Sequence, residues 1–376
     1  MTGKLAPFES IRPTDWQGQP VPPRRWLVPN LLIRGAVTML NGDGGVGKSL
    51  LAQQLVTALA TGRSFLGLPA PQRPIPSLAV FCEDDARELH FRQDRINAHY
   101  GCEMRDLDAL TLVSRVGLDN ELMVFGRRGD VGEESDFYRQ LAEKIRLTRA
   151  ELIVIDTAAD TFMGNEIIRP QVRQFINALA RFATVNDGAV LLTAHPSLTG
   201  LNSGSGLSGS TAWHNTVRGR LYLTRPASIN DSDEETSDAR ILKLMKSNYG
   251  PTGNQLKLTW HDHVFVLQSE GRGASGNLVD RLEIDRAVLE GLRKLVSDGA
   301  QVPADSQVRN GLPTRLRAQR ACRQWSWQAI AAAQERLVAT GKIVKVEMGP
   351  PSKRRIYIRP HDMRLTGEIS IGNAGE

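Results

Sequence analysis

The sequence has few cysteines and no long apolar runs. Only three cysteines occur among 376 residues, Cys82, Cys102 and Cys322, and no two of them form a CxxC pair. This spacing argues against a disulfide framework and a cysteine zinc site, and it is typical of a reducing compartment. No stretch of about 18 apolar residues occurs, and the first residues contain no apolar core of a signal peptide. We therefore expect a cytoplasmic protein without a membrane-spanning segment.

A large excess of one charge is also absent. Lys and Arg outnumber Asp and Glu by 47 to 41, and 41% of the residues are hydrophobic. This composition excludes a disordered chain, and the length is enough for about two domains. The excess charge is local, because residues 281–360 contain 16 Lys and Arg against 7 Asp and Glu. A polyanionic partner is therefore expected at this part of the chain.

Short apolar runs alternate with amphipathic stretches from Ala36 onward. This alternation predicts an α/β domain with a mainly parallel sheet and crossover helices. Four later runs, RGRLYLTR, ARILKLMK, NQLKLTW and HVFVLQ, predict an antiparallel extension of that sheet. The predicted strands of the parallel part are 36–41, 77–83, 110–115, 151–156 and 188–195, and the predicted helices are 49–62, 85–99, 134–149 and 171–187.

Five regions are predicted along the chain. Residues 1–35 are rich in Pro and Arg and are expected to form an extended N-terminal arm. The α/β domain covers 36–268, and the Gly/Ser-rich residues 269–279 are expected to be a linker. Residues 280–360 carry helices followed by a basic hairpin, which is the outline of a winged-helix-like domain. Residues 361–376 are expected to be a flexible tail.

Residues Gly42–Ser49 read GDGGVGKS and match the pattern G-x-x-x-x-G-K-[ST] in full. The pattern follows a predicted strand and begins a predicted helix, which is the context in which it binds nucleotide phosphates with Mg²⁺. Its backbone N–H groups surround phosphate oxygens, Lys48 reaches the β- and γ-phosphates, and Ser49 ligates magnesium. A glycine-rich turn that binds nothing is the alternative. The predicted nucleotide-binding residues are Gly42, Asp43, Gly44, Gly45, Val46, Gly47, Lys48, Ser49 and Leu50.

Two carboxylates are candidates for the chemistry at this site. ELIVID ends in Asp156, the form of a Walker B strand whose carboxylate holds magnesium, although an Asp at a strand end can also be a helix cap. Thr157 follows instead of Glu, which disfavours genuine AAA+ proteins and places the catalytic carboxylate elsewhere. Glu83 is the candidate to orient and deprotonate the attacking water, with Asp84 as its rival. One of Asp84 and Asp85 is expected to cap the next helix.

His195 ends the strand GAVLLTAH and can report loss of the γ-phosphate to the loop that follows. The alternative is a strand-end histidine that faces solvent. The loop, residues 197–212, is Gly/Ser-rich and too long for an ordinary connection. It either contacts nucleic acid through backbone amides or has no ordered structure.

Basic residues follow this loop on the predicted antiparallel strands. Arg218 and Lys246 are candidates for trans-acting fingers that reach the γ-phosphate bound by a neighbouring subunit. The alternative is that they are cations on a solvated strand face.

Together these features resemble the RecA-like ATPases. The P-loop, Glu83, the pair Asp156 and Thr157, TAHP before the Gly/Ser loop, and SGSTAW leading to Arg218 occur in that family's order over about residues 24–268. The subgroup typified by the hexameric plasmid replicative helicase RepA is the most similar. Its usual lead into the P-loop is like RRWLVPNLLIRGAVTMLNGDGGVGKS in this sequence.

The resemblance implies a homo-oligomeric, hexameric ring that binds ATP and Mg²⁺ between subunits and acts on DNA, with single-stranded DNA at the 197–212 loop. By match, Lys48 and Ser49 bind phosphate and magnesium, Glu83 is the catalytic carboxylate and Asp156 is the Walker B acid. His195 is then the sensor and Arg218 the arginine finger. Pro196 in place of a second His, and the additional C-terminal domain, count against processive unwinding more than against ATP hydrolysis.

Three functions remain open from the sequence. They are a DNA-stimulated motor or helicase, a repair or recombination ATPase that organises DNA without unwinding it, and a regulatory ATPase or kinase that acts on protein. No N-K-x-D sequence follows the Walker B strand, which disfavours a GTPase. The basic C-terminal residues favour phosphate contacts with DNA, and a basic protein-interaction domain is the alternative. They include Arg315, Arg317, Arg320, Arg323, Lys353, Arg354 and Arg355.

Overall fold

The structure is a computed structural model, and it describes residues 10–126, 131–195, 211–226, 238–250, 252–268, 278–319, 322–350 and 354–363. The chain divides into two compact units. One comprises Arg25–Leu282, and the other comprises residues up to Arg24 together with Glu283 onward. None of the helices in the described part of the chain combines the length and apolar character needed to cross a bilayer.

The first unit is built on a nine-stranded sheet with the order β13-β12-β11-β10-β3-β9-β8-β4-β5. The strands from β10 to β5 in this order are parallel, and β11, β12 and β13 continue the sheet antiparallel. The predicted mainly parallel α/β sheet with an antiparallel extension is therefore confirmed. The strands are β3 (Ala36–Gly42), β4 (Ser77–Phe81), β5 (Leu110–Ser114), β8 (Leu152–Asp156), β9 (Ala189–Ala194), β10 (Gly219–Thr224), β11 (Ala239–Ser247), β12 (Gln255–His261) and β13 (Val264–Leu267).

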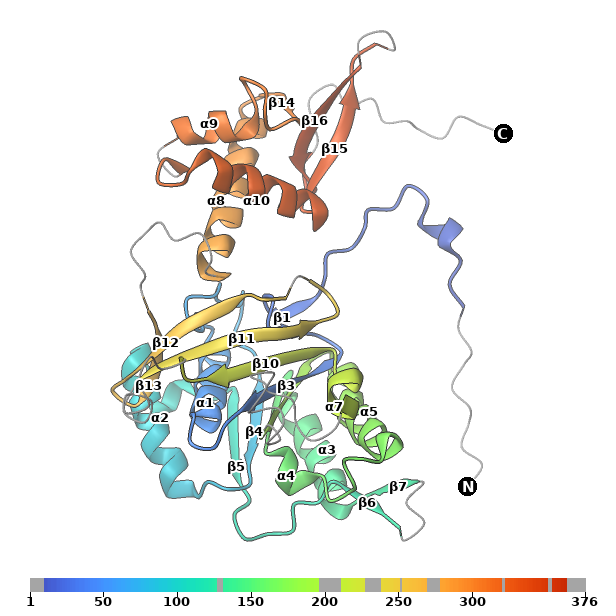
Figure 1. The fold of residues 1–376 in the computed structure, drawn as a ribbon, viewed down its shortest axis with the longest axis vertical. Coiled ribbons are helices and arrows are strands. Elements are labelled where there is room, and N and C mark those ends of the chain that lie inside the picture. Colours follow the sequence, from blue (N-terminus) through green and yellow to red (C-terminus); the bar gives the residue numbers. More distant parts are fainter. Residues whose placement is uncertain are drawn as a thin grey trace. The chain divides into compact units, whose positions relative to one another are not determined.

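Helices cover both faces of this sheet (Figure 1). Successive strand residues point to opposite faces, so β3 contributes Leu40 to one apolar cluster and Met39 to the other. Strands buried on both faces are mainly apolar, and every residue of β3, β8 and β9 is buried. On one face lie α1 (Lys48–Ala60) and α2 (Ala86–Tyr100), and on the other lie α3 (Asp136–Thr148), α4 (Ala158–Thr161), α5 (Arg169–Val185) and α7 (Thr211–Thr216).

The N-terminal arm predicted for residues 1–35 is wrong from Trp26 onward. Strands β1 (Trp26–Val28) and β2 (Leu32–Ile33) form an antiparallel hairpin, and Leu27 and Leu32 are buried in the core of the first unit. The prolines suggested an extended segment, but Pro29 lies in the turn of the hairpin, where its fixed φ is tolerated. Before the hairpin, only a short 3₁₀ helix, Pro13–Trp16, occurs in the described residues.

Two short elements were also missed. Strands β6 (Met123–Phe125) and β7 (Gly132–Glu134) form a small hairpin beyond β5. Of the predicted 197–212 loop, the last two residues belong to α7, and residues 197–210 lie outside the described part of the chain.

The C-terminal unit has its own apolar core, which includes Val288, Leu292, Ile330 and Ile358. Its three strands form an antiparallel sheet with the order β14-β16-β15. Helices followed by a hairpin agree with the winged-helix outline, and the winged-helix assignment stays a prediction. Most of the predicted linker and tail lies outside the described residues. The elements are α8 (Leu278–Ser297), β14 (Val302–Pro303), α9 (Leu312–Ala318), α10 (Trp327–Ala339), β15 (Ile343–Met348) and β16 (Arg355–Pro360).

Candidate active site

Four predicted site segments meet at the carboxyl edge of the parallel strands. The P-loop follows β3, Glu83 follows β4, Asp156 ends β8, and His195 follows β9. Because β3, β9, β8 and β4 are neighbours in the sheet, their carboxyl ends lie side by side. This is the edge at which open α/β sheets bind ligands.

Glycines give the P-loop its path. Gly47 has φ of 101°, and a Cβ there would lie 2.6 Å from the Phe265 ring. A Cβ on Gly42 would lie 2.6 Å from the Leu223 carbonyl oxygen. Neither position can carry a larger side chain without a shift of its neighbours. Gly47 is also the N-cap of α1, so the unpaired N–H groups of that helix point into the loop where phosphate binds.

Lys48 is held inside this loop. Its ammonium donates to the carbonyl oxygens of Gly42 at 2.7 Å and Asp43 at 2.9 Å, and lies 3.4 Å from His195 Nδ1. Burial lowers the pKa of Lys48, and the carboxylates of Asp156, Glu83 and Asp43 act in the opposite direction. The charge that neutralises a polyphosphate therefore sits at the base of the P-loop.

Asp156 is fully buried and faces α1. Burial raises the pKa of Asp156, whereas the neighbouring hydroxyl groups of Thr193 and Ser49 lower it. Thr193 Oγ1 donates to Asp156 Oδ1, and Oδ2 has no hydrogen-bond partner in the described part of the chain. An orphaned carboxylate oxygen beside a P-loop serine fits Mg²⁺, which binds one or two protein oxygens and completes its shell with phosphates and water. A larger protein cage is not needed, and the described residues contain no His/Cys/Asp/Glu cluster that forms one.

The adjacent carboxylates after β4 are used differently. Asp85 caps α2 by accepting from the N–H groups of Arg87 and Glu88, both at 2.9 Å, as expected for one of the two aspartates. Asp84 binds Arg92 with both oxygens, at 2.5 and 3.0 Å. Glu83 makes no ion pair or hydrogen bond among the described residues and faces the pocket. The structure therefore leaves Glu83 available for a water molecule and engages Asp84, its rival.

Charge around Glu83 favours its action as a base. Burial raises the pKa of Glu83, as do the charges of Asp160 and Asp84, while Lys48 lowers it. Asp160 was not selected in the sequence analysis. It lies on α4 and accepts from Thr157 Oγ1 at 2.7 Å, and its charge also raises the pKa of His195. Burial and Lys48 lower the pKa of His195, so the imidazole beside Lys48 tends to be neutral.

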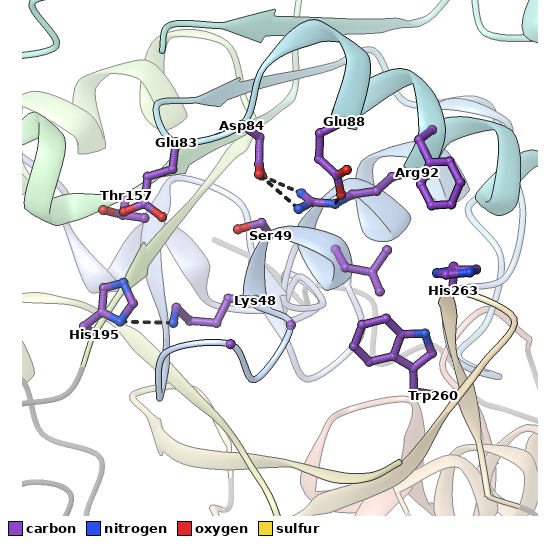
Figure 2. Close-up of a pocket in the computed structure, with 14 residues that line it drawn as sticks. Lys48, Ser49, Glu83, Asp84, Glu88, Arg92, Thr157, His195, Trp260 and His263 are labelled. Atoms are coloured by element: carbon purple, nitrogen blue, oxygen red, sulfur yellow. Dashed lines mark hydrogen bonds and ion pairs between the residues drawn. The ribbon is translucent and has the colours of Figure 1, made fainter. Parts of the chain in front are cut away.

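A pocket of about 310 Å³ connects these groups to an aromatic end (Figure 2). Glu83, Thr157 and His195 lie at one side of it, Lys48 and Ser49 at the centre, and Arg92, Trp260 and His263 at the other side. Phe91 and His263 pack edge to face with centroids 5.1 Å apart, and Trp260 and His263 lie 6.4 Å apart. Phe91, Arg92, Trp260 and His263 were not selected from the sequence. The dipeptide Asp262–His263, with positive φ at both residues, signals a hairpin turn, but nothing local indicates that the turn lies beside the P-loop.

Arg218 and Lys246 are not brought to the pocket of their own chain. The Arg218 N–H donates to the Val37 carbonyl. In the strand register, Lys246 of β11 lies opposite Arg220 of β10, and Arg220 lies opposite Met39 of β3. Met39 is three residues before Gly42, or about 10 Å along the strand. Within one subunit these side chains therefore lie away from Lys48, and their proposed action on a neighbouring subunit stays a prediction.

This fold and site define a P-loop ATPase of the RecA-like type. Residues 6–200 match the AAA domain family AAA_25, which covers half of the chain, so the chain belongs to this family. In this chain Thr157, and not Glu, follows Asp156. Among solved structures, a KaiC-like protein from the hyperthermophilic archaeon Pyrococcus horikoshii OT3 is similar, with 16% identity and a TM-score of 0.45. That likeness covers 66% of this chain and 100% of the other.

Proposed function

We propose that this chain is an ATP-hydrolysing ring motor that acts on DNA, as a replicative helicase of the RepA type does. The observation that carries the ATPase part is the pocket itself, in which an unengaged Glu83, Lys48 and Ser49 face one space, while Asp156 is buried beside Ser49. ATP fits this space with its phosphates at the P-loop and its base toward Trp260 and His263. Ser49 and Asp156 would hold magnesium, which would supply Lewis-acid stabilisation of the phosphates.

The chain's own residues then divide the work. The P-loop amides and Lys48 bind and neutralise the β- and γ-phosphates. Glu83 orients the attacking water and accepts its proton. His195, 3.4 Å from Lys48, is placed to change its contacts when the γ-phosphate leaves, and it passes this change to the loop that begins after it.

A slot for the base is formed at the aromatic end. Asp84 and Glu88 hold the Arg92 guanidinium, with 2.7 Å between Arg92 Nε and Glu88 Oε1. Trp260 and His263 lie on the same side of the pocket (Figure 2). A planar cation and aromatic rings both stack on a purine, so this end provides base contacts that the P-loop lacks.

The antiparallel extension supports action on phosphate-rich partners. Strands β10, β11 and β12 contain no Asp or Glu. Their cations are the half-buried Lys243, Lys246 and Lys257 and the buried Arg220 and Arg240. Arg218 directly precedes β10. A surface of one sign attracts polyanions. We assign Arg218 and Lys246 to the γ-phosphate held by an adjacent subunit, which requires ATP to lie between subunits of a ring.

Strand displacement on a forked DNA duplex tests the motor assignment. Wild-type protein with ATP and Mg²⁺ should displace the strand, and Glu83→Gln protein should bind the fork without displacing it. ATP hydrolysis that DNA stimulates, with no displacement under any fork polarity, would instead support an ATPase that organises DNA. The mass of the particle assembled with a non-hydrolysable ATP analogue gives a second criterion, since a closed ring favours a motor and a filament favours an organiser.

A further inference from the structure

A second groove lies on the C-terminal unit. Its volume is about 720 Å³, within the range of ligand-binding pockets. It is bordered by β14, the loop that follows β14, and the hairpin of β15 and β16. The side chain of Ile356 is 51% exposed, so apolar surface in the groove is open to solvent. The lining includes Pro303, Val308, Ile356 and Tyr357 with the cations Lys345 and Arg355.

The cations of this groove are not engaged. The side chains of Lys345 and Arg355 make no ion pair or hydrogen bond in the described part of the chain, whereas the adjacent Arg354 pairs with Glu347 at 3.4 Å. Asp305, the acid among the lining residues, accepts a hydrogen bond from the Gln307 N–H at 2.8 Å and so stabilises the local turn. The register of the hairpin places Lys345 and Ile356 on one face and Arg355 and Tyr357 on the other, so each face offers a cation beside an apolar or aromatic side chain.

Helix α10, which would read duplex DNA in a winged-helix domain, is poorly suited to binding in the major groove. In helix-turn-helix proteins the second helix of the motif enters the major groove, and cations around it bind phosphates. The exposed side chains of α10 are Gln328, Glu335 and Ala339, which include no cation. Arg336 on α10 is paired with Asp285 at 2.7 Å. If α10 docked in the major groove, the Glu335 carboxylate would lie near the phosphates. The cation of α10, Arg336, is already paired.

We propose that this groove binds single-stranded DNA. Unpaired bases stack on aromatic and apolar side chains, and the backbone runs along cations, which are the two surfaces found here. Tyr357 and Ile356 contact bases, while Lys345 and Arg355 contact phosphates. The inference rests on the proposed DNA-directed function and adds a second strand-binding site to the one assigned to residues 197–212. A duplex, whose bases are already stacked, does not use the apolar lining.

The test is binding of a labelled oligothymidine to the full-length protein at several salt concentrations. Lys345→Gln/Arg355→Gln should weaken binding at least tenfold and lower the slope of log K against log salt by about 1.4, since each phosphate contact on a single strand contributes about 0.7. The matched control is Lys294→Gln/Lys342→Gln, which removes the same charge from exposed positions outside the groove. Ile356→Ser should weaken binding while leaving the salt slope unchanged. ATP hydrolysis without DNA should equal that of wild type in all three, and an unchanged thermal unfolding transition of the C-terminal unit should show that this unit still folds.

Each other outcome is decisive. Equal weakening by the control pair, unchanged affinity of the groove pair, or an equal loss of duplex binding in the groove pair would overturn the inference. An acidic peptide that binds wild type and is lost in the groove pair, with oligothymidine binding intact, would assign the groove to a protein partner. If wild-type protein binds no single-stranded DNA in low salt, the proposed function itself fails.

Discussion

At the scale of single residues, the decisive group is the Glu83 carboxylate. It faces the pocket beside Lys48 and has no partner among the described residues, whereas Asp84 is held by Arg92. We predict that Glu83→Gln retains ATP binding and lowers kcat by about 10²–10⁴-fold, the contribution of a general base. Lys48→Ala, which should abolish ATP binding, is the control. Single-turnover hydrolysis at wild-type rate in Glu83→Gln would move the catalytic role to another group.

Asp160 gives a prediction with a defined direction in pH. Its charge raises the pKa of Glu83, and the base form of Glu83 exists only above that pKa. Asp160→Asn should therefore lower the Glu83 pKa and shift the acidic limb of the kcat profile to lower pH. The exposed Asp298→Asn, on the other unit, should leave the limb in place. A shift to higher pH, or none, would show that Asp160 does not act on Glu83 through its charge.

At the scale of elements, the hairpin of β12 and β13 is predicted to hold the base. Trp260→Ala should cost ATP affinity about 1–3 kcal/mol, the value of one base-stacking contact, while tripolyphosphate binding stays unchanged. Phe91→Ala is the second variant, because Phe91 is 44% exposed and its loss leaves the core intact. Equal losses for ATP and tripolyphosphate would mean that the aromatic residues support the P-loop rather than the base.

The elements also show where reasoning from sequence succeeds. The positions of β3, α1, β4, β8 and β9 follow from apolar runs and the P-loop pattern, because a buried parallel strand is continuously apolar. The hairpin of β1 and β2 was missed because its apolar residues are too few to give a period, and prolines surround them. Trp260 and His263 could not be assigned to the site, since they meet α2 only through the strand order of the whole sheet.

At the scale of the whole molecule, a site that needs two subunits makes a testable claim. Arg218 and Lys246 lie away from the pocket of their own chain, and in the proposed ring each acts on a site contributed by another copy. Arg218→Ala and Lys48→Ala should each abolish hydrolysis alone, because one loses the finger and the other loses nucleotide binding. Mixed in equal amounts, they form some interfaces with an intact P-loop and an intact finger, so part of the activity should return. Absence of any recovery in verified mixed particles would refute the trans finger.

The central claim is that ATP hydrolysis at this site is coupled to DNA. The measurement that tests it most directly is the steady-state ATP hydrolysis rate of the full-length protein in low salt, with and without single-stranded DNA. The expected result is hydrolysis that depends on Lys48 and Glu83 and that single-stranded DNA stimulates. DNA that neither binds nor changes the turnover would contradict it and would favour an ATPase that acts on protein.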